Sequence, residues 1–408
     1  MPDRFNNSLR TRFPSLQRDL ALFICAVALF AFSESIVTSV FNNFLSETFT
    51  ISSFDRTFLE LPRESGGLLI IFMSALLFFL PNRRLAVVAA LLGSVGMILM
   101  ALFSVTFHWT FAWLFIYSLG QHLFMPLNTA IGMELAKEGK TGQRLGQINS
   151  IRNIAIISGS LFVFSGFEFF NLTFKKSFLA AALSFLFSAI FLRAMRPGTA
   201  HSASLHLKIH REYSLFYLLS ILFGTRKQLF LTFAPWVLVT VFHQPTTLLA
   251  TLLLIAGVIG IFFQPLLGMI VDRFGERIVL CGEAVLLIFV CAGYGFGEAW
   301  FSHKTALIIA CICFVADQLL MSVNMARSTY LKKIATDQSH ITPTLTLSVS
   351  LDHVFSISIA LLGGILWSRW GYRTVFIGGM VIALMNFISA SFIRVPPAQH
   401  QRQNQAAS

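Results

Sequence analysis

Residues 268–277 read Gly-Met-Ile-Val-Asp-Arg-Phe-Gly-Glu-Arg, a short polar turn between two long apolar segments. Gly268 permits the close approach of another helix, and Gly275 permits a tight change of direction. The Asp272 carboxylate can accept hydrogen bonds from the N-terminus of a neighbouring helix, where the helix dipole favours negative charge. The turn is held on the inner side of a membrane by its two arginines, Arg273 and Arg277. The stretch therefore predicts a cytoplasmic turn between two membrane-spanning helices, with a contact to a third.

The composition outside this turn is that of a membrane protein. The chain has 408 residues, of which 56% are hydrophobic and 12% charged, and its mean hydropathy is +0.74. About 20 apolar residues are needed for a helix to cross the hydrocarbon core. We therefore predict an all-α membrane protein with twelve spans near residues 20–45, 65–80, 85–107, 109–135, 146–167, 177–192, 214–242, 247–271, 278–296, 305–325, 344–367 and 375–393.

The formal charge of +12 is distributed unevenly between the predicted loops. Of the 30 basic residues, 20 fall in predicted inner segments and 7 in outer ones, which leaves only Arg152, Arg226 and Lys227 within the membrane. Basic residues accumulate on the cytoplasmic side of membrane proteins, so both termini are predicted to be cytoplasmic. The orientation of the chain in the membrane explains this excess of positive charge, which does not indicate a nucleic-acid partner.

The longest predicted inner loop divides the spans into six and six. We expect a cytoplasmic N-terminal segment over 1–19, a six-helix bundle over 20–193, a central loop over 194–213, a second six-helix bundle over 214–393 and a disordered tail over 394–408. Two parallel repeats of six helices are the architecture of one large class of secondary transporters.

The turn at 268–277 resembles the G-x-x-x-D-R-x-G-x-R loop of the major facilitator superfamily. The resemblance implies the fold of that family, alternating access, and a latch role for Asp272 and Arg273. The matching loop of the first half has Phe79 in place of the aspartate and Asn82 in place of the glycine, so the first latch is eroded.

Polar residues recur near the middle of the first, fourth, seventh and tenth spans, which the resemblance implies line a cavity. A charge at this depth costs a few kcal/mol and usually faces a cavity, a partner or a solute. Adjacent helical residues project about 100° apart, so only one of Arg226 and Lys227 is expected to face the cavity. The predicted substrate- and proton-binding residues are Glu34, Gln121, His122, Arg226, Lys227, Asp317 and Asn324.

A second set of polar residues lies nearer the cytoplasmic ends of the fifth and eleventh spans. Arg152, Asp352 and His353 are predicted to form a gate together with the turn residues Gly268, Asp272, Arg273, Gly275 and Arg277. The alternative for Arg152 is snorkelling to the inner surface. The alternative for the deeper charges is structural pairing, of Glu34 with Arg226 or of Asp317 with Lys227. The alternative for His122 is a hydrogen-bonding helix contact, which is the more common role of a lone histidine in a membrane.

The predicted function is transport of a small polar solute, anionic or zwitterionic, across the cell (cytoplasmic) membrane by a monomer embedded in the bilayer. Glu34 and Asp317 are rival candidates for carrying a coupled proton, and no cofactor, metal or catalytic residue is expected. No Walker A loop, nucleophile elbow or metal-ligand cluster is present, which argues against an enzyme. The alternatives are proton-driven multidrug efflux and a non-transporting sensor or lipid scramblase.

Overall fold

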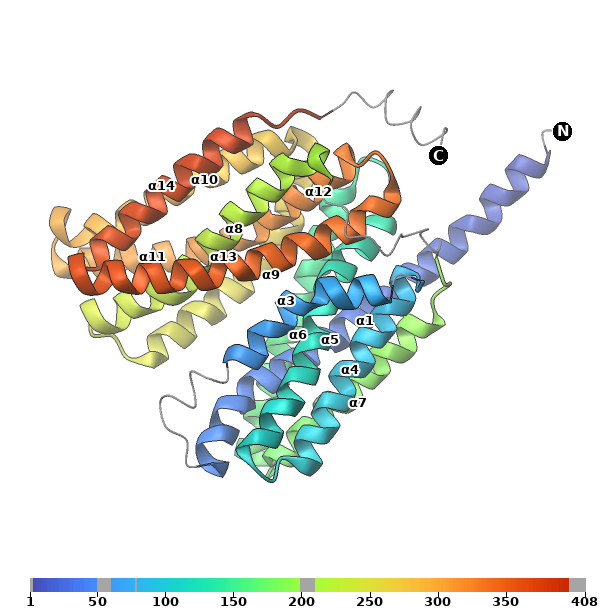
Figure 1. Ribbon diagram of the computed structural model, residues 1–408, viewed down its shortest axis with the longest axis horizontal. Helices are drawn as coiled ribbons and strands as arrows, with labels where there is room; N and C mark the ends of the chain where they lie inside the picture. Colours follow the sequence, from blue (N-terminus) through green and yellow to red (C-terminus); the bar gives the residue numbers. More distant parts are fainter. Residues whose placement is uncertain (1–2, 50–59, 78, 199–209, 396–408) are drawn as a thin grey trace. The chain divides into compact units, whose positions relative to one another are not determined.

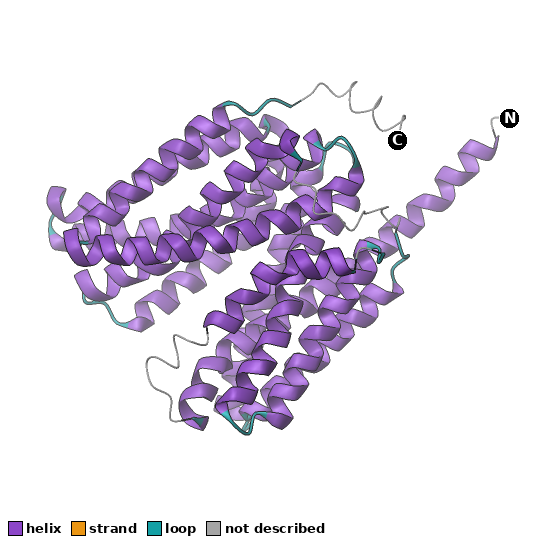
Figure 2. Ribbon diagram, viewed as in Figure 1, coloured by secondary structure: helices purple, strands orange, loops and turns teal. Residues whose placement is uncertain are grey.

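A computed structural model of the chain describes residues 3–49, 60–77, 79–198 and 210–395 (Figure 1). Every regular element in these ranges is helical, which confirms the predicted all-α class (Figure 2). The α-helices are α1 (Asp3–Thr48), α3 (Glu60–Leu76), α4 (Asn82–Phe103), α5 (Phe107–Glu134), α6 (Thr141–Phe169), α7 (Phe174–Ala194), α8 (Ser214–Trp236), α9 (Thr246–Phe274), α10 (Glu276–Trp300), α11 (His303–Leu320), α12 (Asn324–Ile334), α13 (Ile341–Trp370) and α14 (Tyr372–Ser391). Four short helical segments are η1 (Arg211–Tyr213), η2 (Val237–Val241), η3 (Met321–Val323) and η4 (Gln338–His340).

Each of the twelve predicted spans falls on a helix. Within the described residues, nine helical stretches are long and apolar enough to cross a membrane. The other three predicted spans fall on α3, α5 and α8. The last two carry Gln121, His122, Arg226 and Lys227, so the polar residues that lower their hydropathy are those predicted to bind substrate.

Two helices extend beyond the predicted limits. α1 begins at Asp3, so residues 3–19 continue the first helix instead of forming a separate segment. The tenth span continues from α11 through the 3₁₀ turn η3 into α12 and ends at Ile334. Most of the predicted central loop (199–209) and most of the tail (396–408) lie outside the described residues.

The chain forms two compact units. The first comprises residues 1–137 and 151–207, and the second comprises 138–150 and 208–408. The segment 138–150, which the sequence analysis places in the N-terminal bundle, is thus grouped with the second unit. It contains the N-terminal turns of α6, and its contacts there bear on the candidate site.

In the first unit α4 packs against both α5 and α7, while α1 packs against α7 and α3 against α5 (Figure 1). Phe30 of α1 fills the centre, stacked on Phe124 at a ring distance of 3.8 Å and edge-on to Phe185 at 4.8 Å. Small residues permit the tightest contacts: a side chain at Gly96 would overlap the backbone of Tyr117. Close packing of this kind stabilises helix pairs in lipid, where no hydrophobic effect drives them together.

In the second unit α10 packs against α14 and α11, and α8 packs against α13 and α14 (Figure 1). The aromatic core is built on Tyr294, which stacks on Phe376 with ring centroids 4.9 Å apart. The regular helix of α8 ends after Pro235, and the π-helical turn η2 follows. Proline lacks the backbone N–H that a regular α-helix requires, so this change of helix type is expected there.

Candidate functional site

The first unit brings together three predicted residues from three helices. Arg152 of α6 donates to Glu34 of α1 at 3.2 Å, and the side chain of Gln121 on α5 is within hydrogen-bonding reach of the same carboxylate. The Glu34 side chain is 11% exposed and that of Arg152 is 31% exposed. The ion pair is therefore shielded on the carboxylate side and open on the guanidinium side.

Small residues bring α6 close enough to α1 for this pair to form. Ser35 donates to the Ile156 carbonyl at 2.6 Å, and its hydroxyl lies 3.0 Å from that of Ser160. A side chain at Gly159 would overlap Ser35. Arg152 lies two helical turns before Gly159 and so faces the same neighbour. The sequence left open a pairing of Glu34 with Arg226; within its own unit Glu34 pairs with Arg152, and Arg226 pairs with Asp317.

His122, also predicted to bind substrate, is buried on α5. Its Nδ1 lies 2.9 Å from the carbonyl oxygen of Ser118 and 3.1 Å from the Ser118 hydroxyl, one turn earlier on the same helix. Both contacts lie within α5, and the role of His122 in substrate binding stays a prediction.

The second unit contains a sealed network of four charges, of which the sequence analysis identified two. Arg226 of α8 donates to Asp317 of α11 at 2.9 Å and lies 3.7 Å from Glu283 of α10. The other oxygen of Glu283 accepts from Arg327 of α12 at 2.8 Å. All four side chains are at most 4% exposed. Two cations and two carboxylates thus neutralise one another between four helical segments.

Phe223 completes the packing of this network. The Arg327 guanidinium lies 4.6 Å from the centre of its ring, and that of Arg226 lies 5.8 Å away. Arg327 also donates to the Leu219 carbonyl at 3.3 Å. Cation–π contacts of this kind gain strength where the cation is withdrawn from water.

Glu283 and Arg327 are the residues that sequence reasoning missed. Glu283 is an acidic residue in an otherwise apolar span, which is the signal that could have found it. Arg327 was predicted to be a cytoplasmic loop residue because the tenth span was expected to end near residue 325. The helical path through η3 to Ile334 instead keeps it buried.

Lys227, the neighbour of Arg226, points to a different helix and pairs with Asp352 of α13. Gly224 makes room for this pair, because a side chain there would overlap the Asp352 carboxylate. The Lys227 and Asp352 side chains are 23% and 15% exposed, so this pair is open compared with the Arg226 network. The pairing of Asp317 with Lys227 that the sequence left open is thus replaced by two separate pairs.

Two further predicted residues lie close to these pairs along the chain. His353 is buried next to Asp352 on α13, and Asn324 is exposed at the start of α12. Their roles in gating and in substrate binding stay predictions.

The turn at 268–277 makes the predicted helix contact. The Asp272 carboxylate accepts hydrogen bonds from the backbone N–H groups of Gly142 at 2.8 Å and Gln143 at 2.7 Å, at the N-terminus of α6. A side chain at Gly268 would overlap the Gly142 carbonyl. The carboxylate thus satisfies two helix N–H groups that have no partner within the helix.

The remaining residues of this turn have different surroundings. Gly275 has a φ of +84°, in a region that is open mainly to glycine. Arg273 lies over the ring of Phe274 at 5.4 Å, and Arg277 is exposed.

In the first unit a different set of contacts, centred on Arg83, joins α1, α4, α5 and the segment after α7. Arg83, at the start of α4, donates to Asp19 of α1 at 2.6 Å and to Glu134 of α5 at 2.7 Å. It also donates to the Arg196 carbonyl just beyond α7. Arg83 was predicted to be a cytoplasmic loop residue, whereas it is buried and connects α1, α4, α5 and the segment after α7.

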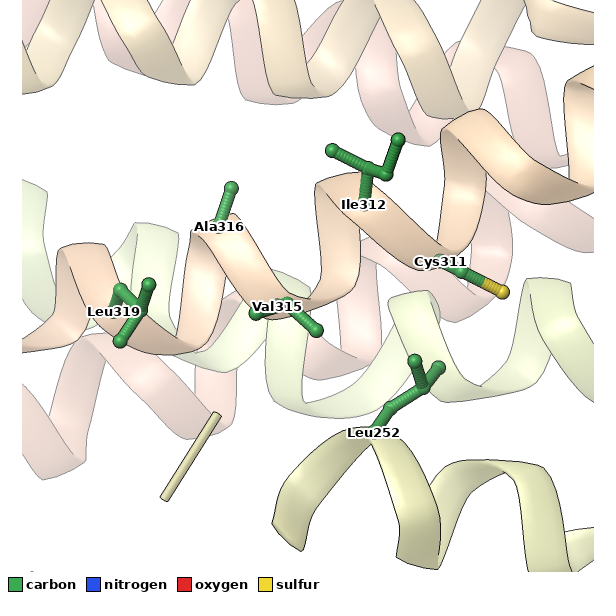
Figure 3. A pocket seen from close by; sticks show the side chains of 6 residues that line it. All are labelled: Leu252, Cys311, Ile312, Val315, Ala316 and Leu319. Carbon is green, nitrogen blue, oxygen red and sulfur yellow. The ribbon is translucent and has the colours of Figure 1, made fainter. Parts of the chain in front are cut away.

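The second unit also has an apolar groove between α9 and α11 (Figure 3). It is lined by Leu252 of α9 and by the α11 residues Cys311, Ile312, Val315, Ala316 and Leu319. This lining offers no charged, amide or hydroxyl group that could orient a polar solute. The groove suits a hydrocarbon chain and contains none of the predicted site residues.

Comparisons with known proteins agree with this arrangement. The family model described as Major Facilitator Superfamily matches residues 23–339 and 216–408, whereas no curated protein matches the chain. Among solved structures, the transporter FucP in its outward conformation is 14% identical with a TM-score of 0.75, over 92% of this chain and 99% of that one.

Two further solved structures have similar folds. The human organic anion transporter MFSD10 (TETRAN) is 12% identical with a TM-score of 0.69, over 92% of this chain and 99% of that one. A bacterial homologue of the iron transporter ferroportin is 14% identical with a TM-score of 0.72, over 91% and 98%. At these identities the likeness establishes the fold, and it leaves the substrate open.

Proposed function

Since the chain belongs to the Major Facilitator Superfamily, we propose that it is a secondary active transporter of a small anionic or zwitterionic organic solute. It works by alternating access in the cytoplasmic membrane, with both termini inside, and it couples solute movement to a proton. Members of this superfamily are transporters, and two solved neighbours are described as a fucose:proton symporter and an organic anion transporter.

The observation that carries this proposal is the contrast between open and sealed ion pairs. Arg152 and Lys227 are 31% and 23% exposed, while Arg226 and Arg327 are at most 4% exposed. An anionic group of a solute can therefore reach Arg152 or Lys227 and replace the carboxylate of Glu34 or Asp352. Arg226 and Arg327 are closed to such an exchange, and we assign them to the scaffold.

Partner exchange also supplies a way to couple a proton. When a solute anion takes Arg152, the Glu34 carboxylate loses its counter-ion at a position that is 11% exposed. An unpaired charge there is costly, and binding a proton removes that cost. In the same way, Asp352 would lose its counter-ion and could bind a proton when a solute anion takes Lys227. Asp317, the other predicted proton carrier, has no such opening because its side chain is sealed at 2% exposure.

The test is transport by purified protein in proteoliposomes, with an internal pH-sensitive dye. Organic anions, amino acids, sugars and lipophilic cations are supplied in turn, with and without a pH gradient. We expect anions or zwitterions to move protons. Glu34→Gln should abolish gradient-driven uptake while it retains solute exchange, because exchange needs no net proton movement. The control is Glu168→Gln, an exposed glutamate at the end of α6.

Each other outcome identifies an alternative. Proton movement with lipophilic cations alone would replace the proposal with multidrug efflux. Silence across the panel, together with lipid movement between leaflets, would point to a scramblase. Wild-type gradient-driven uptake by Glu34→Gln would remove Glu34 from the coupling mechanism.

A further inference from the structure

A cluster of three side chains that the proposed function does not use lies beside the starts of α8 and α13. His210 and Glu212 lie at the start of η1, and His340 ends η4, 128 residues further along the chain than Glu212. One ring nitrogen from each histidine and one oxygen of Glu212 all lie within 4.8 Å of one another. The Glu212 oxygen is 3.5 Å from Nδ1 of His210 and 3.9 Å from Nδ1 of His340.

The charges of this cluster favour a cation between the three side chains. The two imidazole rings are tilted by 31° with centroids 3.9 Å apart, a distance at which two imidazolium ions would repel each other. Neutral imidazole nitrogens and a carboxylate are electron-pair donors, and two histidines with one glutamate form a known ligand set for zinc.

Neighbouring groups hold two of the three donors in place. The Tyr213 hydroxyl oxygen lies 2.9 Å from Nδ1 of His340, and the Thr336 hydroxyl donates to Glu212 at 3.3 Å. The hydroxyls of Tyr213 and Thr336 are 3.1 Å apart, so one chain of hydrogen bonds runs from His340 to Glu212.

The tautomer of His340 sets the direction of each proton in this chain of hydrogen bonds. With Nδ1–H of His340 donating to Tyr213, Tyr213 donates to Thr336 and Thr336 donates to Glu212. Nε2 of His340 is then left unprotonated. A histidine that donates one N–H to such a partner and presents its other nitrogen is the usual arrangement around a bound metal.

We propose that His210, Glu212 and His340 bind a divalent transition-metal ion of the zinc or cobalt type, with water in the remaining position. The side chains are 24%, 47% and 26% exposed, so an ion can enter from solvent. The bound ion connects η1, which leads into α8, to η4, which leads into α13. It would therefore fix the starts of the two helices that carry Lys227 and Asp352.

The test uses full-length protein purified with a tag that contains no histidine and treated with a chelator. Cobalt(II) is titrated in, its visible absorption is recorded, and the bound metal is counted. We expect one ion per chain. His340→Ala and Glu212→Gln should lose this binding, while Tyr213→Phe should keep the stoichiometry and bind about 10- to 100-fold more weakly.

Two controls separate this site from other causes. His108→Gln removes an exposed histidine of the first unit and should leave cobalt binding unchanged. Thermal unfolding in chelator should match wild type for Glu212→Gln, which shows that lost binding is not lost folding. Absence of stoichiometric cobalt, or binding that both His340→Ala and Glu212→Gln leave intact, would overturn the proposal.

Discussion

Arg226 and Lys227 are neighbours in the chain but have different surroundings. Arg226 is sealed among carboxylates of α10 and α11, whereas Lys227 pairs with Asp352 on α13 and keeps 23% of its side chain exposed. A buried charge without a partner costs far more than an exposed one, so the two residues should respond differently to substitution.

For the sealed network we expect loss of stability. Glu283→Ala leaves Arg327 without its carboxylate partner and removes the second carboxylate near Arg226. Breaking a buried pair in this way costs about 3–5 kcal/mol. Thermal or denaturant unfolding in detergent should show this loss, while Glu168→Gln should unfold as wild type does. An unchanged unfolding midpoint for Glu283→Ala would mean that the network contributes little.

For the open pair we expect loss of transport instead. Lys227→Gln should cost roughly 1 kcal/mol of stability, as partly exposed pairs do, and should abolish or severely weaken solute uptake. Uptake and unfolding measured on the same preparation would separate the two effects. Lys304→Gln, at an exposed lysine in the first turn of α11, is the matched control. Wild-type uptake by Lys227→Gln would exclude a solute contact at this position.

At single residues, the sequence could predict which side chains carry charge within the membrane, but not which residues they pair with. Glu34, Asp317, Arg226 and Lys227 were recognisable because each is a charge within an apolar span. Their partners were not recognisable, because partners 91 to 125 residues apart depend on which helices pack together. Helix periodicity gives the direction of a side chain on its own helix and carries no information about the neighbouring helix.

At the scale of elements, the turns determine where helices end. Gly275 joins α9 to α10 with φ +84° and ψ 161°, and Gly371 joins α13 to α14 with φ +82° and ψ 169°. These dihedral angles lie in a region that is essentially restricted to glycine. The first turn was predicted from its sequence. The extension of the tenth helix through η3 was not, because the polar residues after 325 resemble a loop when only hydropathy is considered.

A matched pair of substitutions tests the turn. Gly275→Ala should destabilise the protein by about 1–3 kcal/mol, because alanine is strained at this backbone conformation. Gly282→Ala, on α10 where an added methyl group would meet nothing, should be neutral or stabilise by up to about 1 kcal/mol. Unfolding midpoints of the two variants give the comparison. Equal midpoints would show that the turn relaxes without cost.

At the scale of the whole molecule, the second unit is built from both halves of the sequence. Residues 138–150 belong to it, and they include the N–H groups that Asp272 binds. The predicted division into bundles of six spans could not show this, because a span count assigns each helix to one half. Close backbone contacts at Gly142, Gly146 and Gly268 assign the start of α6 to the second unit.

This arrangement predicts that two fragments of the chain remain associated when they are made separately. Fragments 1–203 and 204–408, made in the same cells, should co-purify, because the first fragment carries residues 138–150. Asp272→Ala removes two hydrogen bonds to a charged group and should weaken association by about 3 kcal/mol, roughly 100-fold. Asp272→Asn should be intermediate and Lys304→Gln silent. Equal recovery of all variants would show that the Asp272 contact does not hold the fragments together.

The ion pair between Glu34 and Arg152 also bears on how the protein is made. The two residues are 118 positions apart, so at about 5–20 residues per second the ribosome needs roughly 6 to 24 s to supply the arginine after the glutamate. During that interval the first helix has a carboxylate and no guanidinium to receive it. Until the fifth span arrives, Glu34 must therefore either bind a proton or stay in contact with water, lipid headgroups or the insertion machinery. A ribosome stalled between these two positions would expose an incomplete helix that quality control can recognise.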